Sequence, residues 1–120
     1  MKRIVLADDS SVVRHALRKM FEESRWIVCA EAVNGEEAIA KVDALKPDVV
    51  ILDLSMPVMN GLTAGCILKK NSADAHLILF TSHGDLLTTQ DLESAGFSAL
   101  ISKEDAGKLV LRAQSLLDAV

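Results

Sequence analysis

The sequence predicts an α/β fold built on a five-stranded parallel sheet, and three observations support this. Short apolar segments alternate with amphipathic segments along the chain, as in parallel strands covered by helices on both faces. The apolar segments are nearly uninterrupted, which is typical of strands buried on both sides. Polar side chains stand where several of these segments end. Of the two common doubly wound strand orders, 2-1-3-4-5 suits five strands better than the six-stranded dinucleotide-binding order.

Length and composition narrow the class of protein. The 120 residues suit one domain, which we expect to span residues 1–120, and the 50% hydrophobic content indicates a globular chain. The net charge of -4 and the scattered basic residues argue against direct nucleic-acid binding. No apolar stretch approaches the ~20 residues of a membrane helix and no signal peptide is evident, so we expect a cytoplasmic protein with no membrane association. Cys29 and Cys66 are expected to be reduced core cysteines.

Each element follows from its local pattern. The predicted strands cover residues 3–7, 26–30, 49–52, 77–81 and 98–102. Apolar residues at helical spacing predict five helices: one carrying apolar residues from Val12 to Phe21, one opening after Asn34-Gly35, one from about Leu62 to Lys70, one ending near Ala95-Gly96, and one from Ala106 to Val120. Ser10 or Ser11 can cap the first helix, and Asp85 or Thr88 can open the fourth.

Charged and hydroxyl side chains stand at the carboxyl ends of four predicted strands. Asp8 and Asp9 follow the first strand, and Asp53 follows the third. Thr81 ends the fourth strand, and Lys103 follows the fifth. Parallel strands bring these ends to one edge of the sheet, where open α/β sheets bind their ligands. In the order 2-1-3-4-5 the first and third strands are neighbours, so the three carboxylates are expected to be adjacent.

Three adjacent carboxylates need a cation or a shared proton. Two carboxylates about 5 Å apart repel by about 3 kcal/mol at an effective dielectric of 20, whereas one neutral hydrogen bond returns about 1 kcal/mol. Mg²⁺ fits a site of hard oxygen ligands beside a phosphate. Asp53 is the candidate nucleophile, Lys103 a point charge for phosphoryl oxygens, and Thr81 a hydrogen-bond donor to them. Each residue alone has an ordinary explanation, but their joint position at strand ends predicts a Mg²⁺ site beside a phosphorylatable aspartate.

The same residues, with their flanking segments, resemble the receiver domains of two-component response regulators. The resemblance runs from Lys2 to Val120 and rests on Asp8-Asp9-Ser10, Leu52-Asp53-Leu54-Ser55-Met56-Pro57, Asn60-Gly61, Thr81-Ser82 and Lys103 after Ala95-Gly96-Phe97-Ser98. It implies a flavodoxin-like (βα)₅ fold and phosphotransfer to Asp53 from a sensor histidine kinase or phosphotransfer protein. Asp9, Asp53 and the Ser55 carbonyl would ligate Mg²⁺ directly, with Asp8 acting through water. Thr81 would then bias the face formed by the fourth helix, fifth strand and fifth helix.

Two departures from the family pattern lie in and after the last strand. The family usually carries Tyr or Phe three residues before the lysine, and this chain has Leu100. Phe97 is expected on the opposite side of the strand, so it does not replace the missing ring, and the resemblance does not extend to a ring-based switch. The family often has a cis proline after the lysine, whereas Glu104 follows Lys103 here and predicts a trans peptide bond.

Two further residues flank the expected phosphoryl site. Ser55 and His83 lie two residues beyond Asp53 and Thr81, at positions that border the phosphoryl group in the family. Our hypothesis is that His83 tunes the lifetime of the phosphoryl group. The alternative is an ordinary loop histidine that faces solvent.

Three functional interpretations follow. The leading one is a stand-alone, phosphorylation-dependent signalling module that acts through protein contacts and catalyses only its own phosphorylation and dephosphorylation. The second is the N-terminal receiver of a multidomain regulator, such as a transcription factor, with a covalently linked output domain. The third is a receiver-like module that binds its partner without phosphorylation; Leu100 favours it, whereas the intact set of site residues opposes it. The face around the fifth strand could also form a homodimer.

Other enzyme classes lack their signatures. A flavin-binding protein of this fold would need a phosphate-cradling loop after the first strand, where Asp8 and Asp9 would repel a phosphate. No Walker A sequence indicates an NTPase. Phosphatases with an aspartyl nucleophile generally carry a second aspartate two residues later, and that position is Ser55.

Overall fold

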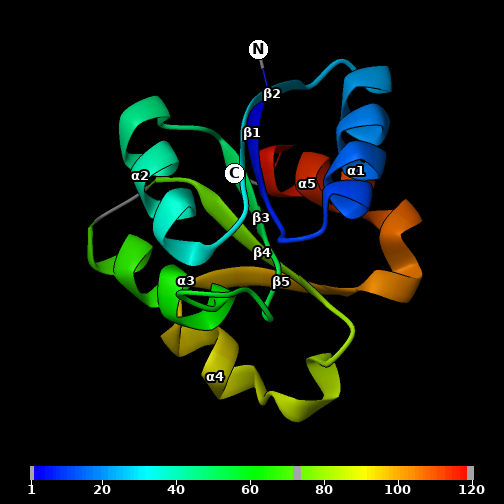
Figure 1. Cartoon of the computed structure of the whole chain (residues 1–120). Helices are drawn as coiled ribbons and strands as arrows, with labels where there is room; N and C mark the ends of the chain where they lie inside the picture. The colour runs from blue at the N-terminus through cyan, green and yellow to red at the C-terminus, as the bar shows by residue number, and fades with distance from the viewer. Residues whose placement is uncertain (1, 72–73, 119–120) are drawn as a thin grey trace.

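A five-stranded parallel sheet in the order β2-β1-β3-β4-β5 forms the centre of the structure (Figure 1). The structure is a computed structural model, and it describes residues 2–71 and 74–118. The strands are β1 (Arg3–Ala7), β2 (Ile27–Ala32), β3 (Val49–Leu52), β4 (His76–Thr81) and β5 (Phe97–Ser102). The predicted fold class and strand order are therefore confirmed.

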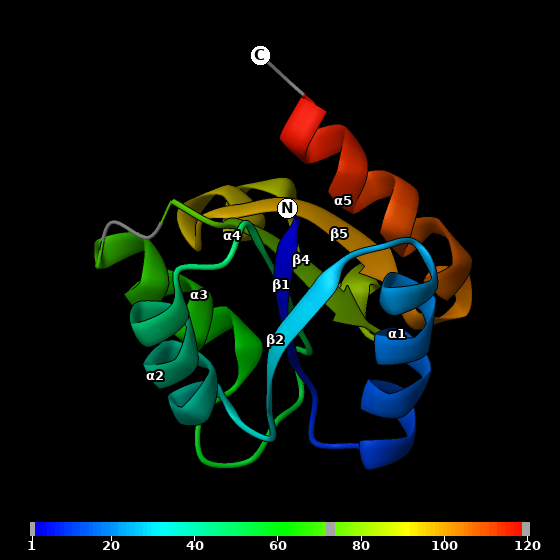
Figure 2. The same ribbon diagram turned by 90° about the horizontal axis from the view of Figure 1, so that it is seen from above.

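Helices cover both faces of this sheet. They are α1 (Ser11–Glu23), α2 (Gly35–Leu45), α3 (Gly61–Lys70), α4 (Thr89–Ser94) and α5 (Leu109–Asp118), with 3₁₀ turns η1 (Gly84–Leu86) and η2 (Lys103–Lys108). Figure 2 shows α1 and α5 on one face of the sheet, and α2 and α3 on the other. Within the described residues, none of these helices has the length and apolar character needed to cross a membrane.

The two faces of the sheet bury separate apolar cores. On the α1 and α5 side, Phe21 and Leu109 pack against sheet residues such as Ile51. On the α2 and α3 side, Val42 and Leu68 pack against the opposite face of the strands. At about 25 cal/mol per Å² of buried apolar surface, these two cores supply the main favourable free energy of folding. They also hold the strand ends rigidly in register.

Side-chain caps begin four of the helices. The side-chain oxygens of Ser10, Asn34, Asn60 and Thr88 each accept a hydrogen bond from a backbone N–H in the first turn of their helix. A cap of this kind stabilises a helix by about 1 kcal/mol. The structure selects Ser10 over Ser11 and Thr88 over Asp85, because these residues adopt extended backbone angles while the helix begins at the next residue.

Most element boundaries lie within one or two residues of the prediction, and two of the differences have a clear physical cause. The last helix begins at Leu109, because residues 103–108 form a 3₁₀ segment in which Asp105 has non-helical backbone angles. Ala106 lies in that segment, and Val120 falls outside the described residues. The second strand begins at Ile27, because the Trp26 N–H donates to the Phe21 carbonyl and its ring packs edge-on against Phe21.

An irregularity in β5 overturns the predicted orientation of Phe97. The pairing with β4 shifts between Leu77 and Ile78, so that one extra residue, Ser98, is accommodated in β5. A β-bulge changes the face on which the following side chains point. Phe97 and Leu100 consequently pack against the same core, and the expected opposite orientation is wrong. Phe97 still does not replace the missing ring, because it lies against Gly65 of α3.

Two smaller expectations concern covalent geometry. The described part of the chain contains no cis peptide bond, so the expected trans bond between Lys103 and Glu104 is confirmed. Cys29 and Cys66 are both free thiols. Both are half-buried and pack against the core on the α2 and α3 side of the sheet. The Cys29 thiol donates to the Ile4 carbonyl between two strands.

The loop between β3 and α3 is held tightly at both ends. The Gly61 N–H donates to the Leu54 carbonyl at 3.0 Å, and a side chain at Gly61 would place its Cβ 2.1 Å from the Asp53 carbonyl oxygen. The Gly35 N–H donates to the Met59 carbonyl and so fastens the loop to α2. Between these points Val58 adopts a φ of 66°, although it is β-branched. The loop therefore stores backbone strain close to Asp53.

Replacing this strained residue by glycine is expected to stabilise the protein. A left-handed conformation costs an L-residue about 1–2 kcal/mol, whereas glycine loses about 0.5–1 kcal/mol through chain entropy. Val58 is 76% exposed, so little packing is lost. We expect Val58→Gly to raise the free energy of unfolding by up to about 1 kcal/mol in urea denaturation. Val58→Ala keeps the Cβ and should recover less; an earlier unfolding midpoint for the glycine variant would contradict the strain argument.

Candidate functional site

The carboxyl ends of the strands form a shallow pocket that gathers most of the sequence-predicted site residues. It is lined by Asp9, Asp53, Ser55, Thr81, Ser82, His83 and Lys103. These residues come from the loops and strand ends after β1, β3, β4 and β5. Asp8 lies beneath them and is 1% exposed. The predicted convergence at one edge of the sheet is therefore observed.

Strand pairing places the three carboxylates together. Ala7 and Leu52 are paired across β1 and β3, so Asp8 and Asp53 follow on neighbouring strands. The Asp53 N–H donates to the Ala7 carbonyl and continues this ladder beyond the strand ends. Asp8 and Asp53 are buried, whereas Asp9 is exposed. Each residue offers one carboxylate oxygen, and these oxygens all lie within 4.8 Å of one another.

Lys103 is the cation that faces this cluster. Its Nζ atom lies 3.0 Å from Asp8 Oδ2 and 3.1 Å from Asp53 Oδ2. The same atom lies 5.8 Å from the centre of the Phe80 ring, which is buried. Lys103 begins η2 directly after β5, where the Ser102 hydroxyl accepts the Glu104 N–H. The local turn thus directs the lysine toward the carboxylates.

The electrostatics of the cluster are unbalanced. Burial raises the pKa of Asp53 and the charge of Asp8 raises it further, and the contact with Lys103 only partly offsets both. Burial works to lower the pKa of Lys103, but its contacts with Asp8 and Asp53 outweigh that effect, so the pKa is raised. The ammonium therefore stays charged. One cation faces three carboxylates, which leaves negative charge uncompensated.

The donor set fits a divalent cation with a preference for hard oxygen ligands. Asp8 Oδ2 is buried and forms an ion pair with Lys103, but it receives no well-directed hydrogen bond. Asp9 adds an exposed carboxylate that can turn toward solvent or an ion. Two or three carboxylates with room for water match the coordination habits of Mg²⁺. In the described part of the chain, no other group of three acidic, His or Cys side chains converges in this way.

The Ser55 and Thr81 backbones and hydroxyls complete the pocket. The Ser55 N–H donates to Asp53 Oδ1 at 3.3 Å. Ser55 is exposed and lies at the mouth of the pocket. Thr81 is buried, and its Oγ1 accepts the His83 N–H at 3.1 Å. A hydroxyl has one proton and two lone pairs, so this contact leaves the Thr81 proton free to donate. The His83 side chain is exposed at the rim.

Leu100 lies behind the loop that follows Thr81. A Cβ built on Gly84 would approach Leu100 Cδ2 to 2.8 Å, so the leucine side chain packs directly against η1. Leu100 also contacts the core on the α3 side of the sheet. The position that usually carries a ring therefore holds a half-buried aliphatic side chain against the loop after Thr81.

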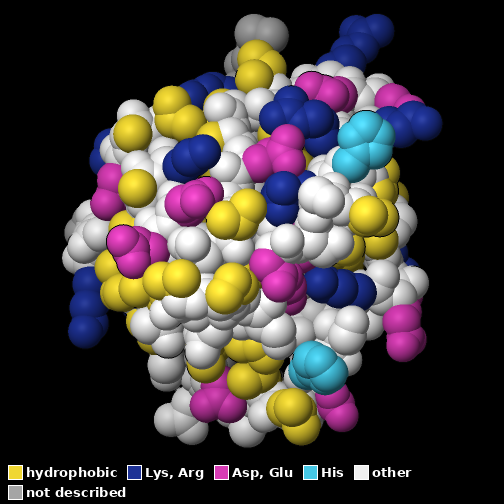
Figure 3. Space-filling view, in the orientation of Figure 1, with side chains coloured by type: hydrophobic (Ala, Val, Ile, Leu, Met, Phe, Trp, Pro, Cys, Tyr) yellow, Lys and Arg dark blue, Asp and Glu magenta, His cyan; other side chains and the backbone are white. Residues whose placement is uncertain are grey.

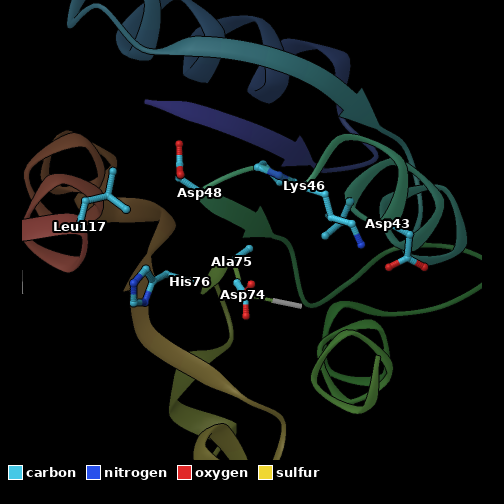
Figure 4. Close-up of a pocket in the computed structure, with 9 residues that line it drawn as sticks. Asp43, Lys46, Asp48, Asp74, Ala75, His76 and Leu117 are labelled. Atoms are coloured by element: carbon cyan, nitrogen blue, oxygen red, sulfur yellow. The ribbon is translucent and has the colours of Figure 1, made fainter. Parts of the chain in front are cut away.

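A second cavity lies at the opposite edge of the sheet. It has a volume of about 480 Å³ and is lined by Val42, Asp43, Lys46, Pro47, Asp48, Asp74, Ala75, His76 and Leu117. Figure 4 shows its labelled side chains spread around the cavity without a common focus. Asp48 is already used there, because its carboxylate accepts the Arg3 N–H. Among the residues that the structure describes, this cavity contains no cluster of converging carboxylates like the one beside Lys103. The carboxyl edge of the sheet is therefore the candidate site.

Two residues beside the site were not anticipated from the sequence. Phe80 places its ring under Lys103, and Arg14 donates a hydrogen bond of 2.8 Å to the Asp8 carbonyl. No spacing rule identifies either residue. An apolar strand residue and a helix-surface arginine have the same sequence appearance whether or not they face a site.

Comparison with known proteins decides the family. The profile of the response regulator receiver domain matches residues 4–114. The chain belongs to this family. The receiver domain is the phosphoacceptor module of two-component signalling, and the fold and constellation described above agree with that assignment.

Two kinds of relative share this receiver sequence. Chemotaxis protein CheY of Halobacterium salinarum is 35% identical over 102 residues, which cover 85% of this chain and 84% of the relative. CheY of Thermotoga maritima is 33% identical over 102 residues, covering 85% of each protein. A protein-glutamate methylesterase/protein-glutamine glutaminase of Methanosarcina acetivorans is 40% identical over 94 residues, or 78% of this receiver domain, but only 26% of the relative's length is matched.

Solved structures resemble the receiver domain closely. CheY in the CheX–CheY complex from Borrelia burgdorferi superposes with a TM-score of 0.88 at 26% identity, covering 97% of this chain and 89% of that one. The response regulator domain of Thermotoga maritima CheB has a TM-score of 0.88 at 24% identity, covering 100% and 98%. The second likeness concerns the fold alone.

The surface of the receiver domain carries no broad basic area on the side shown. Figure 3 shows basic and acidic side chains intermingled there. Such a distribution does not provide the continuous positive stripe that binds a nucleic-acid backbone. The mixture of charges on this side is consistent with the small negative net charge of -4.

Removing the Asp53 charge is expected to stabilise the metal-free receiver domain. The amide in Asp53→Asn removes a buried charge that repels Asp8. In EDTA, we therefore expect a higher free energy of unfolding for the variant than for the wild type, measured by urea denaturation. A Mg²⁺ concentration 100 times the dissociation constant should stabilise the wild type by about 2.7 kcal/mol and the variant by less.

The pH dependence separates this effect from general packing. Because the pKa of Asp53 is raised, the folded state binds its proton more tightly than the unfolded state. From the ordinary pKa of aspartate up to the raised folded value, wild-type stability should therefore fall as the pH rises, and Asp53→Asn should lack this loss. Asp43→Asn, an exposed change at the other edge, is the control. A lower free energy of unfolding for Asp53→Asn than for the wild type in EDTA would show that the pairing of Asp53 with Lys103 outweighs its repulsion by Asp8.

Proposed function

We propose that Asp53 is the residue that accepts the phosphoryl group, with Mg²⁺ bound by the neighbouring carboxylates. The observation that carries the proposal is the convergence of Asp8, Asp9 and Asp53 within 4.8 Å beside Lys103. Asp53 follows the end of β3, belongs to this group and also lines the pocket open to solvent. A phosphodonor can therefore approach it from outside.

The transfer forms one bond and breaks another. A carboxylate oxygen of Asp53 attacks phosphorus, a P–O bond forms, and the P–N bond to the donor histidine breaks, so the imidazole leaves with its electron pair. Lys103 pairs with a phosphoryl oxygen as its contact with Asp53 loosens, and the free proton of Thr81 donates to another. We propose that the chain catalyses only its own phosphorylation and dephosphorylation.

The proposed Mg²⁺ ligands are Asp9, Asp53 and the Ser55 carbonyl, with Asp8 acting through a bound water. Bound Mg²⁺ would neutralise the charge of the carboxylates and of the incoming phosphoryl oxygens. Asp8 suits the indirect role because it is buried and held by Lys103 and by the Ser10 N–H. The exposure of Asp9 and Ser55 suits direct contact with an ion at the mouth of the pocket.

The proposed partners are a sensor histidine kinase or phosphotransfer protein upstream and a protein that recognises the phosphorylated form downstream. The CheY relatives, of which 84–85% corresponds to this receiver domain, support a separate downstream protein, and the methylesterase relative, of which 26% is matched, supports a covalently linked output domain as the alternative. We propose that the chain, residues 1–120, acts as one receiver domain in the cytoplasm. The downstream signal would pass through the α4–β5–α5 face, where Leu100 packs against the loop after Thr81.

Phosphorylation by a small-molecule phosphodonor tests this function. We expect intact-protein mass spectrometry to show one phosphoryl addition in Mg²⁺ and none in EDTA. Asp53→Asn should show no addition, whereas Asp43→Asn at the opposite edge should be phosphorylated as the wild type is. Absence of label under conditions that phosphorylate another receiver domain would favour a phosphorylation-independent interaction module.

The rim residue His83 is expected to influence the lifetime of the phosphoryl group. Its side chain is exposed at the mouth of the pocket, where it can shield or orient an attacking water. We expect His83→Ala to change the dephosphorylation rate severalfold, measured by the decay of the phosphorylated mass after donor removal. His76→Ala, at the far edge of the sheet, is the matched control. An unchanged decay rate for His83→Ala would leave this residue as an ordinary surface histidine.

A further inference from the structure

We propose that Arg14 is a positioning residue for the Mg²⁺ site, and that Glu31 orients it. This inference rests on the proposed function, since it concerns the same metal site. Arg14 lies in the first turns of α1, and its side chain is only 15% exposed. One arm of the guanidinium, Nη1, donates to the Asp8 carbonyl at 2.8 Å. Its Nε donates to Glu31 Oε1 at 3.0 Å.

The Asp8 carbonyl belongs to the peptide group that joins Asp8 to Asp9. Every other polar group of Asp8 is already held: its N–H donates to the Ala32 carbonyl, Oδ1 accepts the Ser10 N–H, and Oδ2 pairs with Lys103. The carbonyl is the remaining polar group of Asp8, and Arg14 is the residue that binds it. By binding it, Arg14 sets the plane of the peptide that leads to Asp9.

Asp9 depends on that peptide for its orientation. Its side chain is exposed, and within the described residues it makes no hydrogen bond or ion pair. A carboxylate without side-chain contacts still rotates about its own torsion angles, but the backbone sets the direction of its Cα–Cβ bond. The position of the Asp8–Asp9 peptide therefore sets the region that the Asp9 carboxylate can reach. It decides how often an Asp9 oxygen lies close enough to the Asp53 carboxylate for both to bind one ion. Pre-orientation of a ligand lowers the entropy cost of binding the ion.

Glu31 makes Arg14 a rigid support. Its second carboxylate oxygen accepts Arg18 Nε at 2.8 Å, and its backbone carbonyl accepts Lys41 Nζ at 3.0 Å. Glu31 lies at the end of β2, so the network connects α1, β2 and α2 around the acidic loop. Arginine suits this place, because its planar fork can bind a carbonyl and a carboxylate in one fixed geometry.

Two other roles for Arg14 make different predictions. A simple clamp between α1 and β2 would affect stability but not metal binding, and Arg18 would serve it equally well. A purely electrostatic role would oppose Mg²⁺, so loss of the charge would tighten binding. Positioning predicts weaker Mg²⁺ binding both when the charge is lost and when it is kept on a side chain of another shape.

The test compares Arg14→Met, Arg14→Lys and Arg18→Met by calorimetric titration with Mg²⁺. We expect both Arg14 variants to weaken Mg²⁺ binding, by roughly 10-fold as for other residues that orient metal ligands. Arg18 contacts the same Glu31 but does not contact Asp8. We therefore expect Arg18→Met to leave the Mg²⁺ affinity unchanged. In Arg18→Met, which leaves the contact between Arg14 and Asp8 in place, the phosphorylation rate should also stay near that of the wild type.

A metal-free readout isolates the local effect. In EDTA, the NMR order parameter of the Asp9 amide should fall in both Arg14 variants and stay unchanged in Arg18→Met. Glu31→Gln retains an acceptor for Arg14 and should preserve the affinity better than Glu31→Met.

Unchanged or tighter Mg²⁺ binding in Arg14→Met, or an equal loss in Arg18→Met, would overturn the inference while leaving the proposed function intact. A wild type that binds no Mg²⁺ would overturn both.

Discussion

Repulsion among carboxylates that the fold forces together is the constraint on which this receiver domain depends. Asp8 and Asp53 are carried to the same point because β1 and β3 are neighbours in the sheet. Burial removes the water that would otherwise screen them. Lys103 follows the edge strand β5, and its side chain reaches past β4 to compensate part of this negative charge. The two apolar cores must therefore stabilise a site whose own electrostatics favour loosening it.

The surroundings of the site show how that instability is contained. The Asp53 backbone is held by the ladder to Ala7, and the close approach of Gly61 holds the loop that follows. Val58 accepts an unfavourable backbone conformation within that loop. On the other side, Arg14 holds the Asp8 carbonyl. Rigid backbone on both sides keeps the carboxylates at short range, where a divalent cation and a phosphoryl group can use their charge.

The edge of the sheet near β5 differs in character from the rigid centre. α4 has only six residues, and its described residues include none that is fully buried. It is kept helical by the reciprocal hydrogen bonds between Thr88 and Asp91. Leu100 contacts the turn between Thr81 and this helix. A short helix with few buried contacts opens at low free-energy cost, so we expect phosphorylation beside Thr81 to act on this edge of the domain.

The sequence by itself determined the strand order, the edge at which the site forms and the five residues Asp8, Asp9, Asp53, Thr81 and Lys103. It could do so because buried parallel strands leave an uninterrupted apolar pattern, and because their ends must meet at one edge. The tertiary structure alone decided the details that depend on packing. The bulge at Ser98 turned Phe97 and Leu100 to the same face, and the fold brought Arg14, Glu31 and Phe80 to the site. Such contacts join residues distant in the chain, and no local pattern encodes the distance between them.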